Sequence, residues 1–419
     1  MDSVLKDYKE TSWDYRTANT KTLTHCFHSY PAMMIPQVAG RLIETYGKNK
    51  KLLFDPYCGT GTSLVEANLR GIKAVGTDLN PLARIIAKTK TTPISKQTLE
   101  FYLKDFNDKI FHYRFGLNKS DSIVLPTFKN IDYWFTVDVQ EKLSLLKEYI
   151  RNIEDFSVRQ FFKVAFSETV RESSLTKNSE FKLFRMKPNQ RENFNPDVFG
   201  IMETKLSRNR NGLYSLMAER EFISDSKVFS FNTVEGIPEK SIEEDSIDIV
   251  VTSPPYGDSR TTVAYGQYSR LANQWMGYEE AGKLDNELMG GKKIEPNSQF
   301  NSNTLNEKID AIGSKDSKRV KDVVSFYVDY QKSIRNISKV VKKGGFASYI
   351  VGNRRVKDET LPTDEITREF FEDNGFQHID THVRNIPHKR MPARNSPTNV
   401  VGKLSTTMNH EYIVVMQKR

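Results

Sequence analysis

The sequence predicts an α/β protein with a doubly wound, mostly parallel sheet of seven strands and an inserted region. Three observations support this fold class. Apolar runs of four to six residues alternate with helical patterns near both ends of the chain. Several of these runs stop at glycine, proline or a polar side chain, which is typical of buried parallel strands. Between the two ends the alternation disappears, so we expect one sheet-containing domain interrupted by an insertion.

The first helix is predicted by an apolar face that contains Val38, Leu42 and Ile43, and Gly47 ends it. The run 290–318 is polar and is expected to be a flexible excursion. The later elements are expected at 51–54 (strand), 64–70 (helix), 73–76 (strand), 80–90 (helix), 228–232 (strand), 246–251 (strand), 326–341 (helix), 346–351 (strand), 363–374 (helix), 378–383 (strand) and 411–416 (strand).

The insertion is expected at 96–227, so that 1–95 and 228–419 form the catalytic domain. It is helical in pattern, charged and rich in aromatic residues. Its stretch 171–191 carries six basic residues against two acidic ones, which suits contacts with phosphates and base edges. Lys182 and Arg185 are the candidates for such contacts. An ordinary solvated loop is the alternative interpretation of this stretch.

Charge, cysteine spacing and the distribution of apolar residues indicate the kind of partner and the cellular setting that we expect. The formal net charge of +9 suits a polyanionic partner. The only cysteines, Cys26 and Cys58, have neither zinc-site nor disulfide spacing, so no metal and a reducing, cytoplasmic setting are expected. The start of the chain has no apolar core of the signal-peptide type, and no stretch reaches the roughly 18 apolar residues of a membrane helix, so a soluble protein without membrane contact is expected.

A glycine loop follows the first strand. Gly59 and Gly61 allow close backbone approach, and a second strand ends at Asp78, 19 residues after Gly59, near the spacing at which such folds bind ribose hydroxyls. Leu64 stands where the third glycine of the dinucleotide fingerprint would fall, which argues against a pyrophosphate ligand. Asp55 would repel phosphate but suits a cation with an α-amino group, such as S-adenosylmethionine.

A second loop, Ser253-Pro254-Pro255-Tyr256, follows the apolar run 246–251. Two successive prolines restrict the backbone, so the carbonyls of Ser253 and Pro254 form a rigid row of hydrogen-bond acceptors. Such acceptors can hold an amino group by its hydrogens, and Tyr256 offers a flat face on which a planar base can stack. A plain proline-rich turn is the alternative.

These two loops together resemble those of the S-adenosylmethionine-dependent DNA amino-methyltransferases, and the serine that opens the second loop is similar to the cytosine-N4 branch. The resemblance implies a Rossmann-like class I methyltransferase fold with an inserted target-recognition region. It also implies that the last two strands form an antiparallel edge of the sheet. The partners it implies are double-stranded DNA and a cognate restriction endonuclease. The cofactor residues implied are Tyr30, Pro31, Asp55, Tyr57, Gly59, Gly61, Thr62, Asp78, Leu79 and Asn232.

Two further loops are candidates for DNA contacts. The stretch 257–270 is rich in glycine and hydroxyl groups and contains Arg260 and Arg270, as expected of a mobile loop that orders on DNA; a static surface loop is the alternative. The basic stretch 386–395 contributes Lys389 and Arg390.

The expected mechanism is direct attack by an exocyclic amino group of a flipped base on the sulfonium methyl group. Methylation at carbon 5 of cytosine is disfavoured, because it needs a thiolate and neither cysteine lies near Ser253 in sequence. Adenine-N6 methylation, guanine amino methylation in structured RNA and a non-catalytic nucleic-acid-binding protein remain the alternatives.

Overall fold

The computed structural model describes residues 12–115, 124–178, 180–219, 226–257, 264–295, 299–386, 394–395, 405–406 and 409–419. Its centre is a seven-stranded sheet of order β3-β2-β1-β4-β5-β11-β8, in which β11 alone runs antiparallel to its neighbours. The predicted sheet and its antiparallel edge are therefore confirmed. The strands are β1 (Leu52–Asp55), β2 (Lys73–Thr77), β3 (Ser226–Phe229), β4 (Ile247–Thr252), β5 (Val341–Val351), β8 (Phe376–Asn385) and β11 (His410–Lys418).

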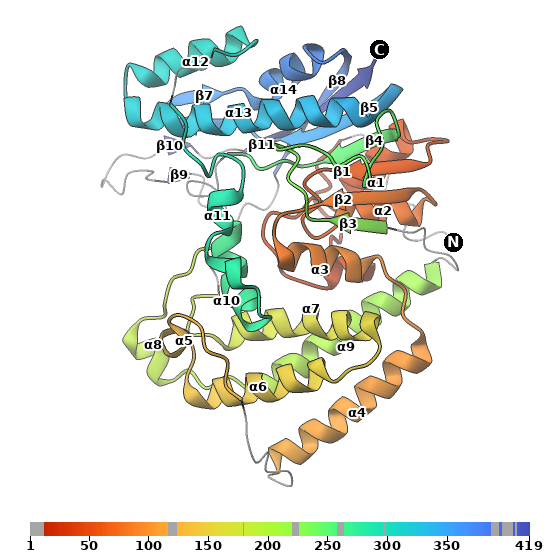
Figure 1. Cartoon of the computed structure of the whole chain (residues 1–419), viewed down its shortest axis with the longest axis vertical. Coiled ribbons are helices and arrows are strands. Elements are labelled where there is room, and N and C mark those ends of the chain that lie inside the picture. Colours follow the sequence, from red (N-terminus) through yellow and green to blue (C-terminus); the bar gives the residue numbers. More distant parts are fainter. Residues whose placement is uncertain are drawn as a thin grey trace.

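Helices cover both faces of this sheet (Figure 1). Neighbouring strand residues point to opposite faces, so Phe54 packs with α13 and α14 while Leu53 packs with α1 and α2. Both side chains are fully buried, as expected of a strand in the middle of a parallel sheet. The helices are α1 (Pro36–Tyr46), α2 (Thr62–Leu69), α3 (Pro81–Lys90), α12 (Asn303–Gly313), α13 (Ser317–Val340) and α14 (Thr363–Glu372).

A helical region lies between β2 and β3 in the chain and beneath α3 in Figure 1. Its longer helices, at 96–114, 137–151, 156–173 and 198–219, share one apolar core with α3 and α10, which includes Leu82, Phe162 and Trp275. The region therefore packs directly against the helices that flank the strand ends. Its helices are α4 (Lys96–Arg114), α5 (Ile131–Trp134), α6 (Val137–Arg151), α7 (Phe156–Ser173), α8 (Pro188–Glu192) and α9 (Val198–Glu219).

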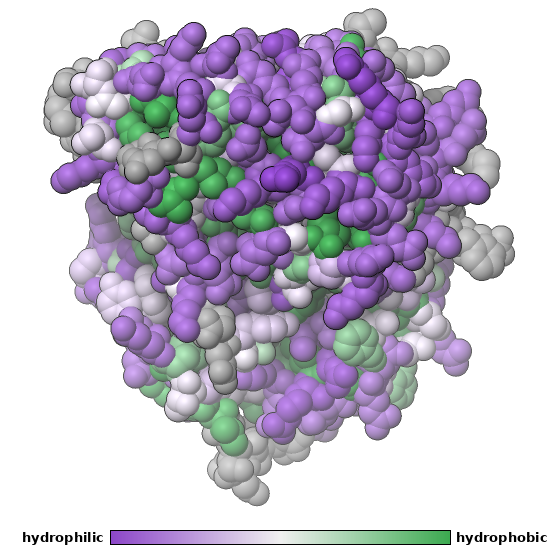
Figure 2. Space-filling view, turned by 45° about the horizontal axis from the view of Figure 1, so that its top comes forward, coloured by the Kyte–Doolittle hydropathy of each residue, from purple (hydrophilic) through white to green (hydrophobic). Residues whose placement is uncertain are grey.

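The remaining described elements are 3₁₀ turns, helices and short strands outside the seven-stranded sheet. Hydrophilic side chains cover most of the face in Figure 2, with apolar side chains in patches between them. No helix among the described residues is long and apolar enough to cross a membrane. The remaining elements are the 3₁₀ turns at Leu23–Cys26 and Glu279–Gly282, α10 (Tyr265–Trp275), α11 (Leu284–Glu287), β6 (Arg354–Val356), β7 (Glu359–Leu361), β9 (Arg394–Asn395) and β10 (Ser405–Thr406).

The expected flexible excursion at 290–318 is wrong over half of its described part. Residues 303–313 form α12, in which Leu305 and Ile312 are buried, and α13 begins at Ser317. The polar residues that suggested a loop are helix caps: Ser302 accepts a hydrogen bond from the Leu305 amide, and Asp316 accepts from the amide of Arg319.

Three further boundaries differ from expectation. The stretch 257–270 is not a loop throughout, because α10 starts at Tyr265 and buries Tyr268 and Leu271 against the helical region. Strand β3 stops at Phe229, and the Asn232 side chain instead accepts a hydrogen bond from the Val234 amide in the turn that follows. Strand β5 begins at Val341, before the glycines expected to precede it, with a register irregularity opposite β4.

Candidate active site

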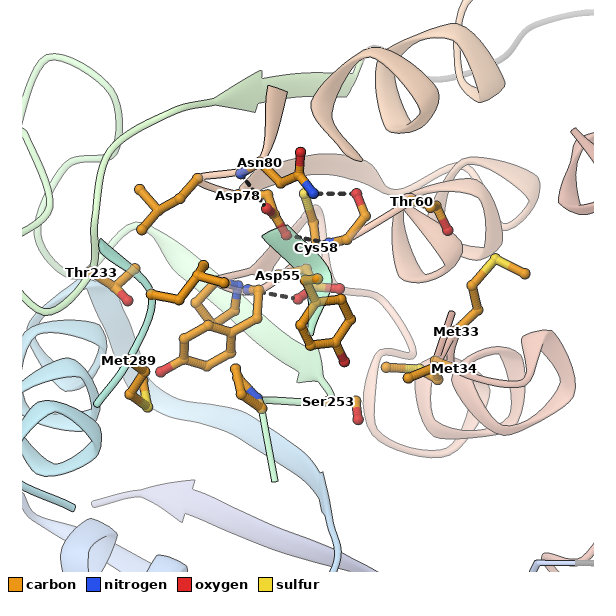
Figure 3. A pocket seen from close by; sticks show the side chains of 18 of the residues that line it. Met33, Met34, Asp55, Cys58, Thr60, Asp78, Asn80, Thr233, Ser253 and Met289 are labelled. Carbon is orange, nitrogen blue, oxygen red and sulfur yellow. Dashed lines mark hydrogen bonds between the residues drawn. The ribbon is translucent and has the colours of Figure 1, made fainter. Parts of the chain in front are cut away.

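One pocket lies at the carboxyl ends of β1, β2 and β4, beside the turn after β3 (Figure 3). It gathers nine of the ten predicted cofactor residues; the tenth, Gly61, is not part of the lining. Of the predicted catalytic loop, which is Ser253-Pro254-Pro255-Tyr256, the residues Ser253 and Pro255 line the pocket. The described lining contains two carboxylates, Asp55 and Asp78, and no lysine, arginine or histidine. A cation therefore fits this pocket better than a phosphate does.

The glycine loop bends sharply between β1 and α2. Gly59 and Gly61 have φ angles of +47° and +76°, which favour glycine. A Cβ atom on Gly61 would lie 2.9 Å from the Cβ of Ala87 in α3, whereas one on Gly59 would meet nothing within 4 Å. Gly61 thus lets α2 start against α3, and Gly59 leaves room on the pocket side of the loop.

Asp55 ties this loop to its neighbours. Its carboxylate accepts hydrogen bonds from the Thr252 hydroxyl at 2.5 Å, from the Tyr57 amide at 3.1 Å and from the Ser63 hydroxyl. Burial raises its pKa to about 6, although the hydrogen bonds from Ser63 and Thr252 oppose that shift. Asp55 is therefore a structural tie as well as a wall of the pocket, which sequence spacing did not indicate.

Asp78 closes the other side of the glycine loop. It accepts hydrogen bonds from the Gly59 amide at 3.0 Å and from the Asn80 amide at 2.8 Å. Burial raises its pKa, and these two amides act against the rise. A carboxylate offers about four lone-pair sites, so two remain for hydroxyl donors of a ligand.

Asn80 is a functional residue that sequence reasoning missed. Its side chain is buried and donates to the Tyr30 hydroxyl at 2.7 Å and to the Ser269 hydroxyl at 3.0 Å, while it accepts from the Asn273 amide group at 3.1 Å. Tyr265 stacks on Tyr30 with ring centroids 6.0 Å apart. The sequence predicted a helix that starts at Asn80 but not this link between α10 and the pocket.

Sulfur-containing and hydroxyl side chains complete the wall. In Figure 3, Met33 and Met34 lie near Thr60 on one side of the pocket, and Thr233 and Met289 lie on the other. Met289 is buried and follows α11, far from the cofactor motifs in the chain. No sequence pattern pointed to Thr233 or Met289, because only the folded chain brings their segments to the pocket.

The catalytic loop is anchored at the edge of the sheet. The Ser253 hydroxyl lies 3.1 Å from the Tyr256 hydroxyl, which in turn donates to Glu411 of β11 at 3.0 Å. Arg384 of β8 donates to the other Glu411 oxygen. Tyr256 and Pro254 do not line the pocket, so its wall in this loop is formed by Ser253, Pro255 and Gly257.

The predicted DNA-contact residues lie in different places. Lys182 is half-buried in the segment between α7 and α8, and Arg185 lies there with its guanidinium 4.0 Å from the Tyr133 ring centroid. Arg270 lies in α10, 3.9 Å from the Asp285 carboxylate. Arg260, Lys389 and Arg390 lie outside the described residues.

The chain is similar in sequence to known type II methyltransferases. Over 424 aligned residues the chain is 40% identical to the type II methyltransferase M.MvaI of Kocuria varians. The alignment covers 96% of this chain and 93% of M.MvaI. The chain is 27% identical over 169 residues to the type II methyltransferase M.MjaII of Methanocaldococcus jannaschii, covering 39% and 31% of the two chains. No family model matches the sequence.

Among solved structures, the rRNA methyltransferase aviRa from Streptomyces viridochromogenes aligns over 99% of this chain and 96% of its own, with a TM-score of 0.34 and 11% identity. An overlap this loose adds nothing to the sheet topology above. The assignment rests on the similarity to M.MvaI, because the alignment covers 96% of the chain and so includes the sheet-forming segments as well as the helical region between them. The fold is that of a Rossmann-like class I methyltransferase, the methyl donor is S-adenosylmethionine, and the chain belongs to the type II methyltransferase family.

Proposed function

We propose that this protein is a site-specific DNA methyltransferase that transfers a methyl group to the exocyclic N4 amino group of cytosine in duplex DNA. The observation that carries the proposal is the position of Ser253. Its loop borders the same pocket as Asp55 and Asp78, so a base held at Ser253 faces the methyl donor. The name of M.MvaI, a type II methyltransferase, supports the same reaction class.

The pocket residues suit S-adenosylmethionine. The buried carboxylate of Asp55, the half-buried carboxylate of Asp78 and the absence of basic side chains from the described lining favour a sulfonium cation with an α-amino group. We assign Asp78 to the ribose hydroxyls, Asn232 to the adenine, and Tyr30 with Pro31 to the methionine end. When bound, the cofactor supplies an electrophilic methyl group.

The chain itself positions the target base. We propose that Tyr256 stacks on the flipped base, at an unstacking cost of a few kcal/mol. Ser253 and the Pro254 carbonyl then accept hydrogen bonds from the amino group, which turns its lone pair toward the methyl group. No metal ligand is needed for this step, because positioning and charge placement supply the catalysis.

We assign residues 1–95 and 228–419 to the catalytic domain and the region 96–227 to target recognition. The helical region packs against α10, which contributes Tyr265 to the pocket, so a DNA contact there lies within one helix of the active site. Lys182, Arg185 and Arg270, with Arg260, Lys389 and Arg390, are the proposed DNA contacts. A cytoplasmic restriction-modification system with a partner endonuclease is the proposed setting.

The test is incubation of the purified protein with labelled S-adenosylmethionine and mixed-sequence duplex DNA, followed by nucleoside digestion and mass analysis. We expect N4-methylcytosine. N6-methyladenine would keep the mechanism and overturn the choice of base, and label in RNA but not in DNA would overturn the choice of nucleic acid. Ser253→Ala is the control variant, since it should bind the cofactor and transfer poorly.

A further inference from the structure

A chain of hydrogen bonds runs from the pocket to the far edge of the sheet. It starts at the Ser253 hydroxyl, passes through the Tyr256 hydroxyl at 3.1 Å and reaches the Glu411 carboxylate after a further 3.0 Å. Arg384 holds the opposite carboxylate oxygen. Glu411 lies outside every motif of the sequence and does not line the pocket.

The direction of these hydrogen bonds follows from counting protons. An ionised carboxylate only accepts, and a tyrosine or serine hydroxyl has one proton to donate. Tyr256 donates its proton to Glu411, so its oxygen can only accept from Ser253. The Ser253 proton therefore points away from the pocket. The two lone pairs of the Ser253 oxygen are then left to accept hydrogens of the target amino group.

Glu411 is held firmly enough to impose this direction. Arg384 and Glu411 are opposite one another in the β8–β11 register. Only 5% of the Arg384 side chain and 16% of the Glu411 side chain are exposed. Arg384 also donates to the carbonyl of Trp13 at 3.1 Å, so its guanidinium has little freedom. Both ends of the ion pair are thus fixed by backbone that pairs across the sheet.

The Tyr256 hydroxyl remains protonated at neutral pH. Burial raises its pKa well above the usual value of a tyrosine, and the charge of Glu411 raises it further. A hydroxyl that never ionises is a reliable link between a fixed acceptor and Ser253.

We propose that Glu411 is a positioning residue that makes Ser253 an acceptor. An aspartate in this place of the loop would accept without help, whereas a serine can turn its proton in either direction. Glu411 removes that freedom through Tyr256. Because the role presupposes methyl transfer to an amino group, it rests on the proposed function.

Glu411→Gln is the informative variant, because it keeps the shape of the side chain and reverses the direction of the hydrogen bonds between residue 411, Tyr256 and Ser253. Arg384 requires an oxygen, so the glutamine amide nitrogen must face Tyr256 and donate to it. Tyr256 then donates to Ser253, and the serine proton is pushed toward the target amino group. The expected result is a single-turnover transfer rate lower by about 100-fold, the size of effect expected from misplaced reacting groups.

The Tyr256→Phe background separates this role from a merely structural one. Without the tyrosine hydroxyl, Glu411 has no path to Ser253. Glu411→Gln should therefore slow transfer in the wild-type background and leave the rate of Tyr256→Phe unchanged. Asp14→Asn is the matched control: Asp14 binds Asn385 beside Arg384, at 2.7 Å from the Asn385 amide, but makes no described hydrogen bond to the catalytic loop.

The readouts are the single-turnover rate on duplex DNA with both substrates saturating, and the Kd of S-adenosylmethionine by calorimetry. Equal rates for Glu411→Gln and the wild type would overturn the proposal, as would equal slowing by Glu411→Gln in both backgrounds. A loss of cofactor affinity as large as the loss of rate would assign Glu411 to the pocket wall and also overturn it. A wild-type protein that transfers nothing to DNA overturns the proposed function itself.

Discussion

The carboxylate of Asp55 and the hydroxyl of Thr252 lie 2.5 Å apart, and this hydrogen bond joins the glycine loop to the catalytic loop. Thr252 is the last residue of β4, and Ser253 follows it directly. β1 and β4 are parallel neighbours, so their carboxyl ends meet at one edge of the sheet. This single bond therefore links the residues that shape the donor site to those proposed to hold the acceptor.

Replacing Thr252 by valine tests that link. Valine keeps the volume but removes the hydroxyl, so Asp55 loses a buried donor and the free energy of unfolding should fall by roughly 1–3 kcal/mol. Urea unfolding measures the change. Thr252→Ser, which retains the hydroxyl, should lose clearly less; equal losses would mean that the methyl group rather than the hydrogen bond matters.

Tyr256→Ala tests the division of labour between the two loops. The tyrosine does not line the cofactor pocket, so the Kd of S-adenosylmethionine should stay within a few-fold of the wild-type value. Transfer to DNA should collapse, because the stacking surface and the contact with Ser253 are both lost. Calorimetry and a filter-binding transfer assay give the two numbers. Parallel loss of both would contradict the assigned roles.

The two glycines of the cofactor loop should differ in their tolerance of alanine. Gly59→Ala meets no atom within 4 Å, so only the left-handed backbone costs free energy, about 1–2 kcal/mol. Gly61→Ala adds contacts of 2.9 and 3.0 Å with the Cβ and Cα atoms of Ala87, and roughly 2–5 kcal/mol is expected. The denaturant midpoints of the two variants measure the difference in their stability. A Gly61 variant as stable as the Gly59 variant would show that α3 yields easily.

His28 should make stability depend on pH. It is buried beside Ser167 and Glu168, and burial lowers its pKa from 6.5 to about 4. The unfolded chain therefore takes up a proton first, so stability present above pH 6.5 is lost as the pH falls toward 4, by on the order of 3 kcal/mol. The other charges facing His28 belong to Arg208, Lys205 and Arg171.

His28→Gln is the comparison protein, because an amide does not titrate in this window. Asp55, whose pKa is raised to about 6, acts with the opposite sign, but it is present in both proteins and cancels in their difference. Thermal unfolding of the two proteins at pH 7.5 and pH 4.5 gives the measurement. Parallel pH profiles would show that His28 is not the group responsible.

Three of the predicted site residues lie together at one edge of the sheet for a shared physical reason. Gly59, Asp78 and Ser253 each follow a short apolar strand, and the carboxyl ends of parallel strands converge. Recognising the strands therefore placed these side chains at one edge. Where local polarity was the only guide, as at 303–313, the expectation failed, because two buried apolar residues and a cap outweighed the polar surface of α12.

Other parts of the site depend on contacts that no local pattern encodes. Asn80 meets Ser269 and Asn273 only because α10 packs against α3, and Met289 enters the pocket from a segment beyond α11. Glu411 reaches Tyr256 only because β11 pairs with β8 in the register that places Glu411 opposite Arg384; a shift by one residue would turn its side chain to the other face.

The sequence by itself determined the class of sheet, the order of the two loops along the chain and the chemical character of the donor site, because strand periodicity, glycine and proline act within a few residues of one another. Only the tertiary structure decided which distant side chains complete the pocket and which carboxylate sets the direction of the Ser253 hydroxyl. Those contacts depend on strand register and helix packing, which are settled by the burial of the whole core rather than by any single segment.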